Sequence, residues 1–230
     1  MTVKEEFLMK IDVLYSIGNE IIGTIKEDQP IKKENLIVYA FLNKTIRLLL
    51  ALKTLIFAEF EEESQILVRV LVETRINFDY FLLIAKEDYD KAFMRVFDSI
   101  MLEKMKALVA TDYLIGDFHV DKVKWTRIEK EIIGRYNSSE FKQLKRYGFS
   151  GLSLKGRVEK TNNQQYYDLI YRMYSRNVHS TDTAEQILDF IMPEPEEVTL
   201  YEESRINALL QTAYNCSFAI VDNCKNWLEN

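Results

Sequence analysis

Hydrophobic residues recur at helical spacing along nearly the whole chain. In the first run, apolar residues stand three or four positions apart until Pro30 interrupts them. Comparable runs follow in five further segments: 33–60, 64–87, 89–113, 164–179 and the residues after Pro195. We therefore expect an all-α protein, folded as a single-domain helical bundle over residues 1–230.

The segment 64–87 differs from the others because it is apolar on nearly all sides. A helix without a polar face belongs in the centre of a bundle, and Ser64 is placed to cap it. A buried charge without a partner is strongly unfavourable, so the few charged residues here need partners. Arg69, Glu73 and Asn77 recur every four residues and predict one polar line inside the bundle.

The composition changes between residues 117 and 160. Five of the seven glycines lie between positions 116 and 156, which predicts short helices near 120–133 and 139–147 and a loop after them. Basic residues concentrate in the same region. We interpret residues 117–160 as a basic, glycine-containing insertion on the bundle rather than as a second domain.

Charge is distributed unevenly along the chain. Between Lys122 and Lys160, eleven Lys or Arg residues face four Asp or Glu, a net charge of +7 in a chain whose total is -6. A solvated helical surface explains such a run. The alternative is a docking surface for RNA or an acidic protein partner, with Lys142, Lys145 and Arg146 as contact residues.

Composition also bears on the compartment. Seven glycines and three prolines are few for 230 residues, as in helical proteins. Cys216 and Cys224 stand eight positions apart on one expected helix, too far for a disulfide between them, which fits a reducing compartment. No secretory signal opens the sequence, and Lys53 interrupts its most apolar stretch. We expect a cytoplasmic protein with no membrane partner.

The stretch YRMYSRNVHS, residues 171–180, holds the densest group of reactive side chains. If a helix continues through His179, then Arg172, Arg176 and His179 share one stripe, because seven residues complete nearly two turns. Such a stripe suits RNA cleavage, with His179 moving a proton and Arg172 and Arg176 holding the phosphate. These three residues are the predicted catalytic set, and the mechanism needs no metal or cofactor.

A structural role for the same residues is the alternative. His179 can bond to a backbone carbonyl or to Glu73, and Arg172 can pair with Asp168. Tyr171 and Tyr174 suit packing as well as contact with a substrate. Zinc and di-iron sites need more His, Cys and Glu at fixed spacings than this chain supplies.

Several of these positions together resemble a bacterial family catalogued as domain-of-unknown-function 5677, over residues 35–190. The matching positions are Arg69, Glu73, Ser150, Gly151, Tyr171, Tyr174, Val178 and His179. Phe149 stands where the family usually has Trp. The resemblance implies a helical fold and a role for these positions, with Arg69, Glu73, Tyr171 and Tyr174 as candidates for substrate binding. It implies no particular reaction.

Arg172 and His179, with six residues between them, are also similar to the motif of HEPN ribonucleases, which are small helical bundles that dimerise. This likeness implies a homodimer and a metal-independent ribonuclease acting in stress or defence. The alternative, from a different class, is a non-catalytic helical module that binds a partner or a small anion.

Overall fold

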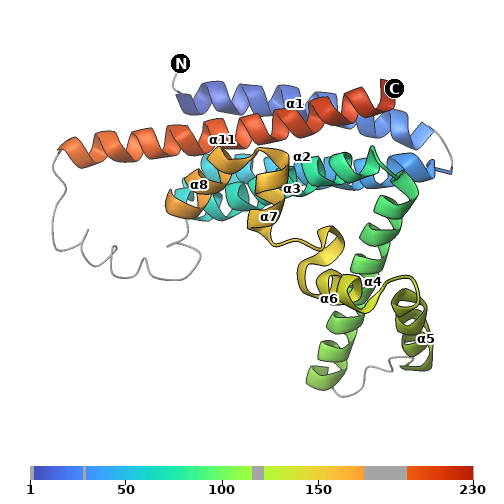
Figure 1. Cartoon of the computed structure of the whole chain (residues 1–230). Coiled ribbons are helices and arrows are strands. Elements are labelled where there is room, and N and C mark those ends of the chain that lie inside the picture. Colours follow the sequence, from blue (N-terminus) through green and yellow to red (C-terminus); the bar gives the residue numbers. More distant parts are fainter. Residues whose placement is uncertain (1–2, 28–29, 116–121, 174–195, 230) are drawn as a thin grey trace. The chain divides into compact units, whose positions relative to one another are not determined.

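The structure is a computed structural model that describes residues 3–27, 30–115, 122–173 and 196–229 (Figure 1). Over these residues it contains nine α-helices, one short 3-10 helix and no strand. The expectation of an all-α protein is confirmed.

The helices follow the hydrophobic runs of the sequence closely. In chain order they are α1 (Val3–Glu27), α2 (Lys33–Phe57), α3 (Glu61–Ala85), α4 (Tyr89–Ile115), α5 (Lys122–Ile133), α6 (Ser138–Tyr147), the 3-10 helix η1 (Gly148–Ser150), α7 (Leu154–Thr161), α8 (Gln164–Met173) and α11 (Glu196–Glu229). One prediction of a cap is wrong. Ser64 lies inside α3 and its hydroxyl donates to the Phe60 carbonyl at 2.7 Å, because the helix already begins at Glu61.

The chain divides into two compact units. Unit 1 comprises Met1–Phe78 and Asn162–Asn230, and unit 2 comprises Asp79–Thr161, so the boundary falls within α3. Residues 117–160, interpreted from the sequence as an insertion, belong to unit 2 together with α4. The organisation as one domain over residues 1–230 stays a prediction.

Unit 1 is built around three helices, α1, α2 and α11, which pack against one another (Figure 1). The core side chains of these helices are apolar and fully or almost fully buried: Ile11, Leu14, Ile25, Leu42, Leu49, Leu52, Ala213, Cys216 and Ile220. Phe41 of α2 contacts Phe78 of α3, with ring centroids 5.0 Å apart. Burial of such side chains is the main favourable term in folding.

The composition of α2 fits either a membrane or the core of a helical bundle. By length and composition it could cross a membrane, because an 18-residue stretch within it has a mean hydropathy of 1.4. Eight of its residues are buried inside the protein. The same composition is typical of the core helix of a bundle in water. The cytoplasmic location and the absence of a membrane partner stay predictions.

Unit 2 is organised along α4, which packs against η1, α6 and α5. Its small core contains the buried residues Leu102, Ile132 and Leu144, surrounded by partly buried apolar side chains. Beside it lies the buried carboxylate of Asp98, which accepts hydrogen bonds from Arg135 Nη1 and, at 2.9 Å, from Tyr136 Oη. Since both donors lie between α5 and α6, Asp98 fixes that connection to α4.

Candidate functional site

The predicted catalytic stripe falls largely on residues that the structure does not describe. Three predicted site residues lie outside the described ranges: Tyr174, Arg176 and His179. Tyr171 and Arg172 lie in α8, where only their backbone is described. Asp168, the expected partner of Arg172, accepts a hydrogen bond from Gln164 Nε2 at 2.9 Å. The catalytic assignment stays a prediction.

Arg69 and Glu73 form an ion pair on α3 in unit 1. Arg69 Nε donates to Glu73 Oε1 at 3.2 Å, one helical turn apart. The side chain of Arg69 is 19% exposed and that of Glu73 is 37% exposed. Their spacing in the sequence thus corresponds to a direct contact, while their part in substrate binding stays a prediction.

Helix α6 carries the three basic residues that the sequence proposed for RNA contact. The helix is held at its N terminus by a capping box: the Asn137 side chain accepts bonds from the Ser139 and Glu140 amides at 3.0 and 2.9 Å, and Glu140 Oε2 accepts one from the Asn137 amide at 3.1 Å. Such a box satisfies backbone donors that a helix start otherwise leaves open. The basic residues therefore lie on a well-anchored helix.

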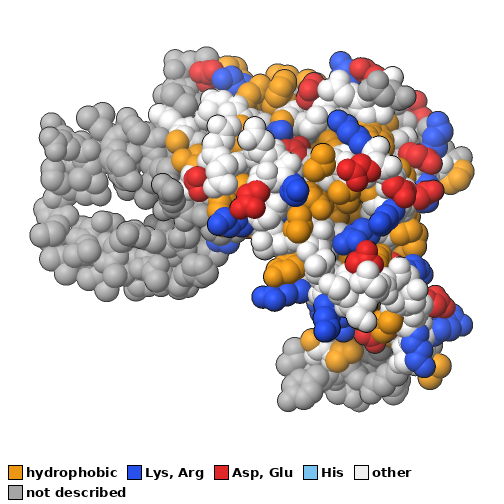
Figure 2. Space-filling view, in the orientation of Figure 1, with side chains coloured by type: hydrophobic (Ala, Val, Ile, Leu, Met, Phe, Trp, Pro, Cys, Tyr) orange, Lys and Arg blue, Asp and Glu red, His pale blue; other side chains and the backbone are white. Residues whose placement is uncertain are grey.

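Lys142, Lys145 and Arg146 are all exposed. Lys145 Nζ lies 3.5 Å from Glu129 Oε1, whereas within the described chain Lys142 and Arg146 form no ion pair. The guanidinium of Arg146 lies 5.0 Å from the ring centroid of Tyr147. Figure 2 shows Lys and Arg side chains over this part of the surface with single acidic residues between them. Two of the three cations are therefore available to a polyanion.

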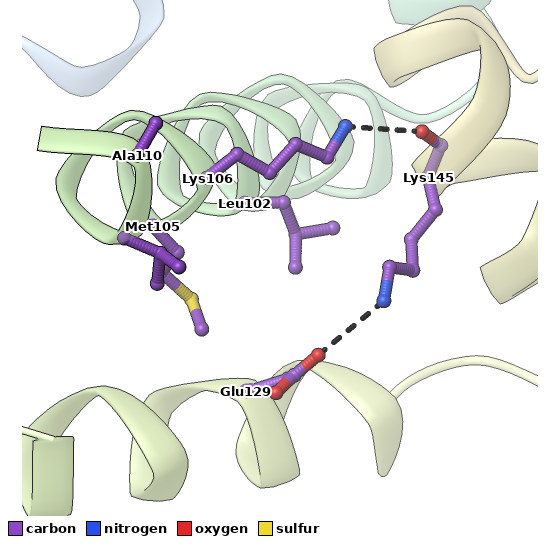
Figure 3. A pocket seen from close by; sticks show the side chains of 7 residues that line it. Leu102, Met105, Lys106, Ala110, Glu129 and Lys145 are labelled. Atoms are coloured by element: carbon purple, nitrogen blue, oxygen red, sulfur yellow. Dashed lines mark hydrogen bonds and ion pairs between the residues drawn. The ribbon is translucent and has the colours of Figure 1, made fainter. Parts of the chain in front are cut away.

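A largely apolar pocket of about 700 Å³ lies between α4, α5 and α6 (Figure 3). Leu102 and Met105 contribute to its apolar wall. At its rim, Lys106 Nζ donates to the Lys145 carbonyl at 3.3 Å, and Lys145 Nζ reaches Glu129. Both lysines are thus already engaged, since Lys145 pairs with Glu129 and Lys106 pairs with Glu103 at 2.6 Å.

The Ser150–Gly151 pair of the family resemblance lies in a tightly bonded loop between α6 and α7. The buried Ser150 hydroxyl accepts hydrogen bonds from the Leu152 amide at 3.1 Å and from Arg157 Nη1 at 2.8 Å. Arg157 Nη1 also donates to the carbonyls of Tyr147 at 3.3 Å and Leu152 at 3.0 Å. Arg157 of α7 thereby closes the loop.

Two other helices, α3 and α4, also hold this loop, and all of the residues involved belong to unit 2. Arg95 of α4 donates from Nε to the Phe149 carbonyl at 2.9 Å, and Tyr80 of α3 donates to the Ser150 carbonyl at 3.4 Å. The rings of Tyr80 and Phe149 have centroids 6.2 Å apart. Burial raises the pKa of Tyr80, although the charges of Arg95 and Arg157 oppose that rise. The loop is therefore fixed by groups from three helices.

Two features of the structure favour glycine at Gly151. Its φ of 66° lies in the left-handed region, which side chains disfavour. A Cβ atom there would also lie 2.8 Å from Arg95 Nη2. The absence of a side chain at Gly151 thus lets the Arg95 guanidinium lie against the loop.

Sequence reasoning missed Tyr80, Arg95 and Arg157. A usable signal was present for Arg95, which stands within the apolar stripe of α4 next to Val96 and close to Ala92, both buried. A charged residue in such a stripe indicates either a specific partner or a site.

Within the described residues, no group of three His, Cys, Asp or Glu side chains could hold a metal ion.

Comparison with known proteins identifies one family. The protein-family model described as "Family of unknown function (DUF5677)" matches residues 35–195, which is well over half of the chain. The match includes the loop with Ser150 and Gly151 and the segment with Arg172 and His179. No curated protein and no solved structure matches the chain.

Proposed function

The chain belongs to the DUF5677 family of unknown function, and we propose that it is an RNA-binding helical protein that cleaves RNA without a metal ion. The observation that carries the proposal is the basic character of residues 122–160, with their net charge of +7, on helices where Lys142 and Arg146 stay exposed. Surface cations that no acid neutralises bind phosphate polymers by releasing counterions.

Aromatic rings beside these cations add to the support for RNA as the polymer. The guanidinium of Arg146 lies 5.0 Å from the ring centroid of Tyr147, and Lys145, although paired with Glu129, lies 5.4 Å from that of Phe141. Both rings are partly exposed. Pairs of cations and aromatic rings suit single-stranded nucleic acid, because the cation meets the phosphate and the ring stacks on a base.

The cleavage step uses the stripe of Arg172, Arg176 and His179. His179 accepts the proton of a ribose 2′-hydroxyl, whose oxygen attacks the neighbouring phosphorus. The bond from phosphorus to the 5′-oxygen breaks, and water protonates that oxygen to give the 5′-hydroxyl product, leaving a 2′,3′-cyclic phosphate. Arg172 and Arg176 offset the charge that develops on the phosphate oxygens. The HEPN-like spacing of Arg172 and His179 supports this assignment.

Labelled single-stranded RNA incubated with the purified protein and a metal chelator tests the proposal. We expect products ending in a 2′,3′-cyclic phosphate, and a rate that falls roughly 100-fold or more in His179→Ala with an unchanged melting temperature. His119→Ala, at the other histidine of the chain, is the matched control and should cleave normally. Wild-type protein that leaves every RNA intact, at concentrations where it is a homodimer, would overturn the nuclease.

A non-catalytic interaction or anion-binding module is the second candidate. It is favoured by the pairing of Arg69 with Glu73 at 3.2 Å, because charged groups that satisfy each other are typical of a structural polar cluster. This candidate predicts salt-dependent binding of RNA or an acidic partner without cleavage. It also predicts that His179→Ala lowers stability instead of activity.

A further inference from the structure

Unit 2 contains a pocket of about 330 Å³ beside the Ser150–Gly151 loop. Its wall includes Tyr80, Glu87, Lys91, Arg95, Gln143 and Leu152. A volume in this range suits a small organic molecule. None of these residues takes part in the RNA cleavage proposed above, so the pocket needs a separate explanation.

Arg95 is the central group of the pocket. It is partly buried, its Nε is engaged by the Phe149 carbonyl at 2.9 Å, and it forms no ion pair within the described chain. A guanidinium has five N–H donors, so four on the two Nη atoms are left for other acceptors. The edge that carries both Nη atoms matches the two oxygens of a carboxylate.

The Arg95 side chain is held in place before any ligand binds. The bond to Phe149 fixes Nε, and the ring centroid of Tyr136 lies 5.9 Å from the guanidinium carbon. Gly151 leaves room for Nη2, since a Cβ would approach it to 2.8 Å. Preorganisation of this kind raises affinity, because less conformational freedom is lost on binding.

The charges around the pocket balance, which argues against a polyanion. Lys91 and Arg95 contribute two positive charges, and Glu87 and Asp88 contribute two negative ones. The Asp88 carboxylate already accepts the Lys91 amide at 3.0 Å, at the start of α4. Glu87 and Asp88 are both exposed, but the Lys91 amide occupies one oxygen of Asp88, so Glu87 is the acid with both oxygens open to a ligand. A ligand that carries both signs of charge fits this lining better than a phosphate.

We propose that the pocket binds a small amino-acid-like zwitterion, with its carboxylate on the Nη edge of Arg95 and its ammonium group toward Glu87. The side chain of the ligand then lies against the apolar part of the wall, which includes Ile84, Ala92 and Leu152. Lys91 and Gln143 contribute further donors at the rim. The site is independent of RNA cleavage.

Isothermal titration calorimetry with the full chain tests the proposal, using the twenty free amino acids, acetate, ethylamine and inorganic phosphate. We expect at least one amino acid to bind, and acetate and ethylamine to bind at least tenfold more weakly. Binding of phosphate or acetate as tightly as any amino acid would refute the proposal that the ligand is a zwitterion. Failure of every amino acid to bind at about 10 mM would overturn the site.

Substitutions then assign the two ends of the ligand. Arg95→Lys keeps the charge but loses the bidentate edge, and should weaken amino-acid binding about tenfold or more. Because Arg95 also holds the loop, the exposed Glu87 provides a second variant: Glu87→Gln should weaken the amino acid but not acetate. Lys104→Gln, at an exposed lysine of α4 outside the pocket, should change neither. Equal amino-acid binding by Glu87→Gln and wild type would refute the contact between the ammonium group and Glu87. A protein that fails to cleave RNA but binds an amino acid would refute the nuclease and not this pocket.

Discussion

Arg157 Nη1 lies 2.8 Å from Ser150 Oγ, so that one guanidinium nitrogen of α7 satisfies a buried hydroxyl in the loop before it. The same nitrogen also meets the carbonyls of Tyr147 and Leu152. A single side chain thereby fixes both ends of the loop that forms one wall of the pocket. Ser150 is one of the positions that resemble the family, and its hydrogen bond with Arg157 is a structural reason for a serine there.

Arg157→Ala should destabilise unit 2 by about 2–4 kcal/mol, because buried acceptors in the loop lose a charged donor. Amide hydrogen exchange gives a local readout. The Leu152 amide, which donates to Ser150 Oγ, should exchange faster in the variant. Lys155→Ala, at an exposed residue of the same helix, is the control and should leave that amide unchanged. Equal exchange in the two variants would contradict the role of Arg157.

Gly151→Ala should destabilise the protein by about 1–3 kcal/mol, because alanine is strained at a φ of 66° and its methyl group meets Arg95 Nη2. Gly156→Ala is the matched control. Gly156 lies within α7, and its nearest contact for a new Cβ is an ordinary 3.4 Å from Leu152 Cβ. That change should be neutral or stabilise by up to about 1 kcal/mol. Chemical denaturation of both variants measures the difference, and a loss at position 156 as large as at 151 would refute the argument.

The helices were predictable from sequence, whereas the pocket was not. Periodicity and glycine placement predicted short helices near 120–133 and 139–147, and α5 and α6 lie there, because local spacing determines which face of a helix is buried. The loop contacts join residues 54 and 70 positions apart, Arg95 with Phe149 and Tyr80 with Ser150. No local pattern encodes such pairs. The one available sign was a charged residue within an apolar stripe.

Tyr136 should make stability fall at alkaline pH. Burial and its hydrogen bond to Asp98 raise its pKa above the usual value of 10.0. The folded state therefore keeps the proton at pH values where the unfolded chain has lost it. The contribution to stability is complete below about pH 10 and is lost as the pH rises toward the folded-state pKa.

Melting temperatures measured from about pH 8 to pH 11 check this dependence. Tyr136→Phe should be less stable by about 1 kcal/mol at neutral pH, since Asp98 loses a donor, and its stability should fall less steeply above pH 10. Tyr15→Phe, at an exposed tyrosine of α1, is the control and should follow the wild type. A Tyr136→Phe curve parallel to the wild type would show that another group causes the alkaline loss.

RNA affinity should depend steeply on salt if Lys142 and Arg146 contact phosphates. Each phosphate contact contributes about 0.7 to the slope of log affinity against log salt for a single strand, so Lys142→Glu combined with Arg146→Glu should reduce the slope by about 1.4 and weaken binding most at low salt. Fluorescence anisotropy with a labelled RNA at several salt concentrations measures both quantities.

Lys44→Glu provides the control for a general change of charge. Lys44 is exposed on α2 and, like Lys142, forms no ion pair within the described residues. Lys44→Glu alters the net charge by the same amount as Lys142→Glu or Arg146→Glu alone. Lys44, however, belongs to unit 1 and lies outside residues 122–160. We expect less than a twofold effect on RNA binding, against about tenfold for Lys142→Glu at low salt. A Lys44→Glu effect as large as that of Lys142→Glu would mean that overall charge, and not contact at α6, governs the affinity.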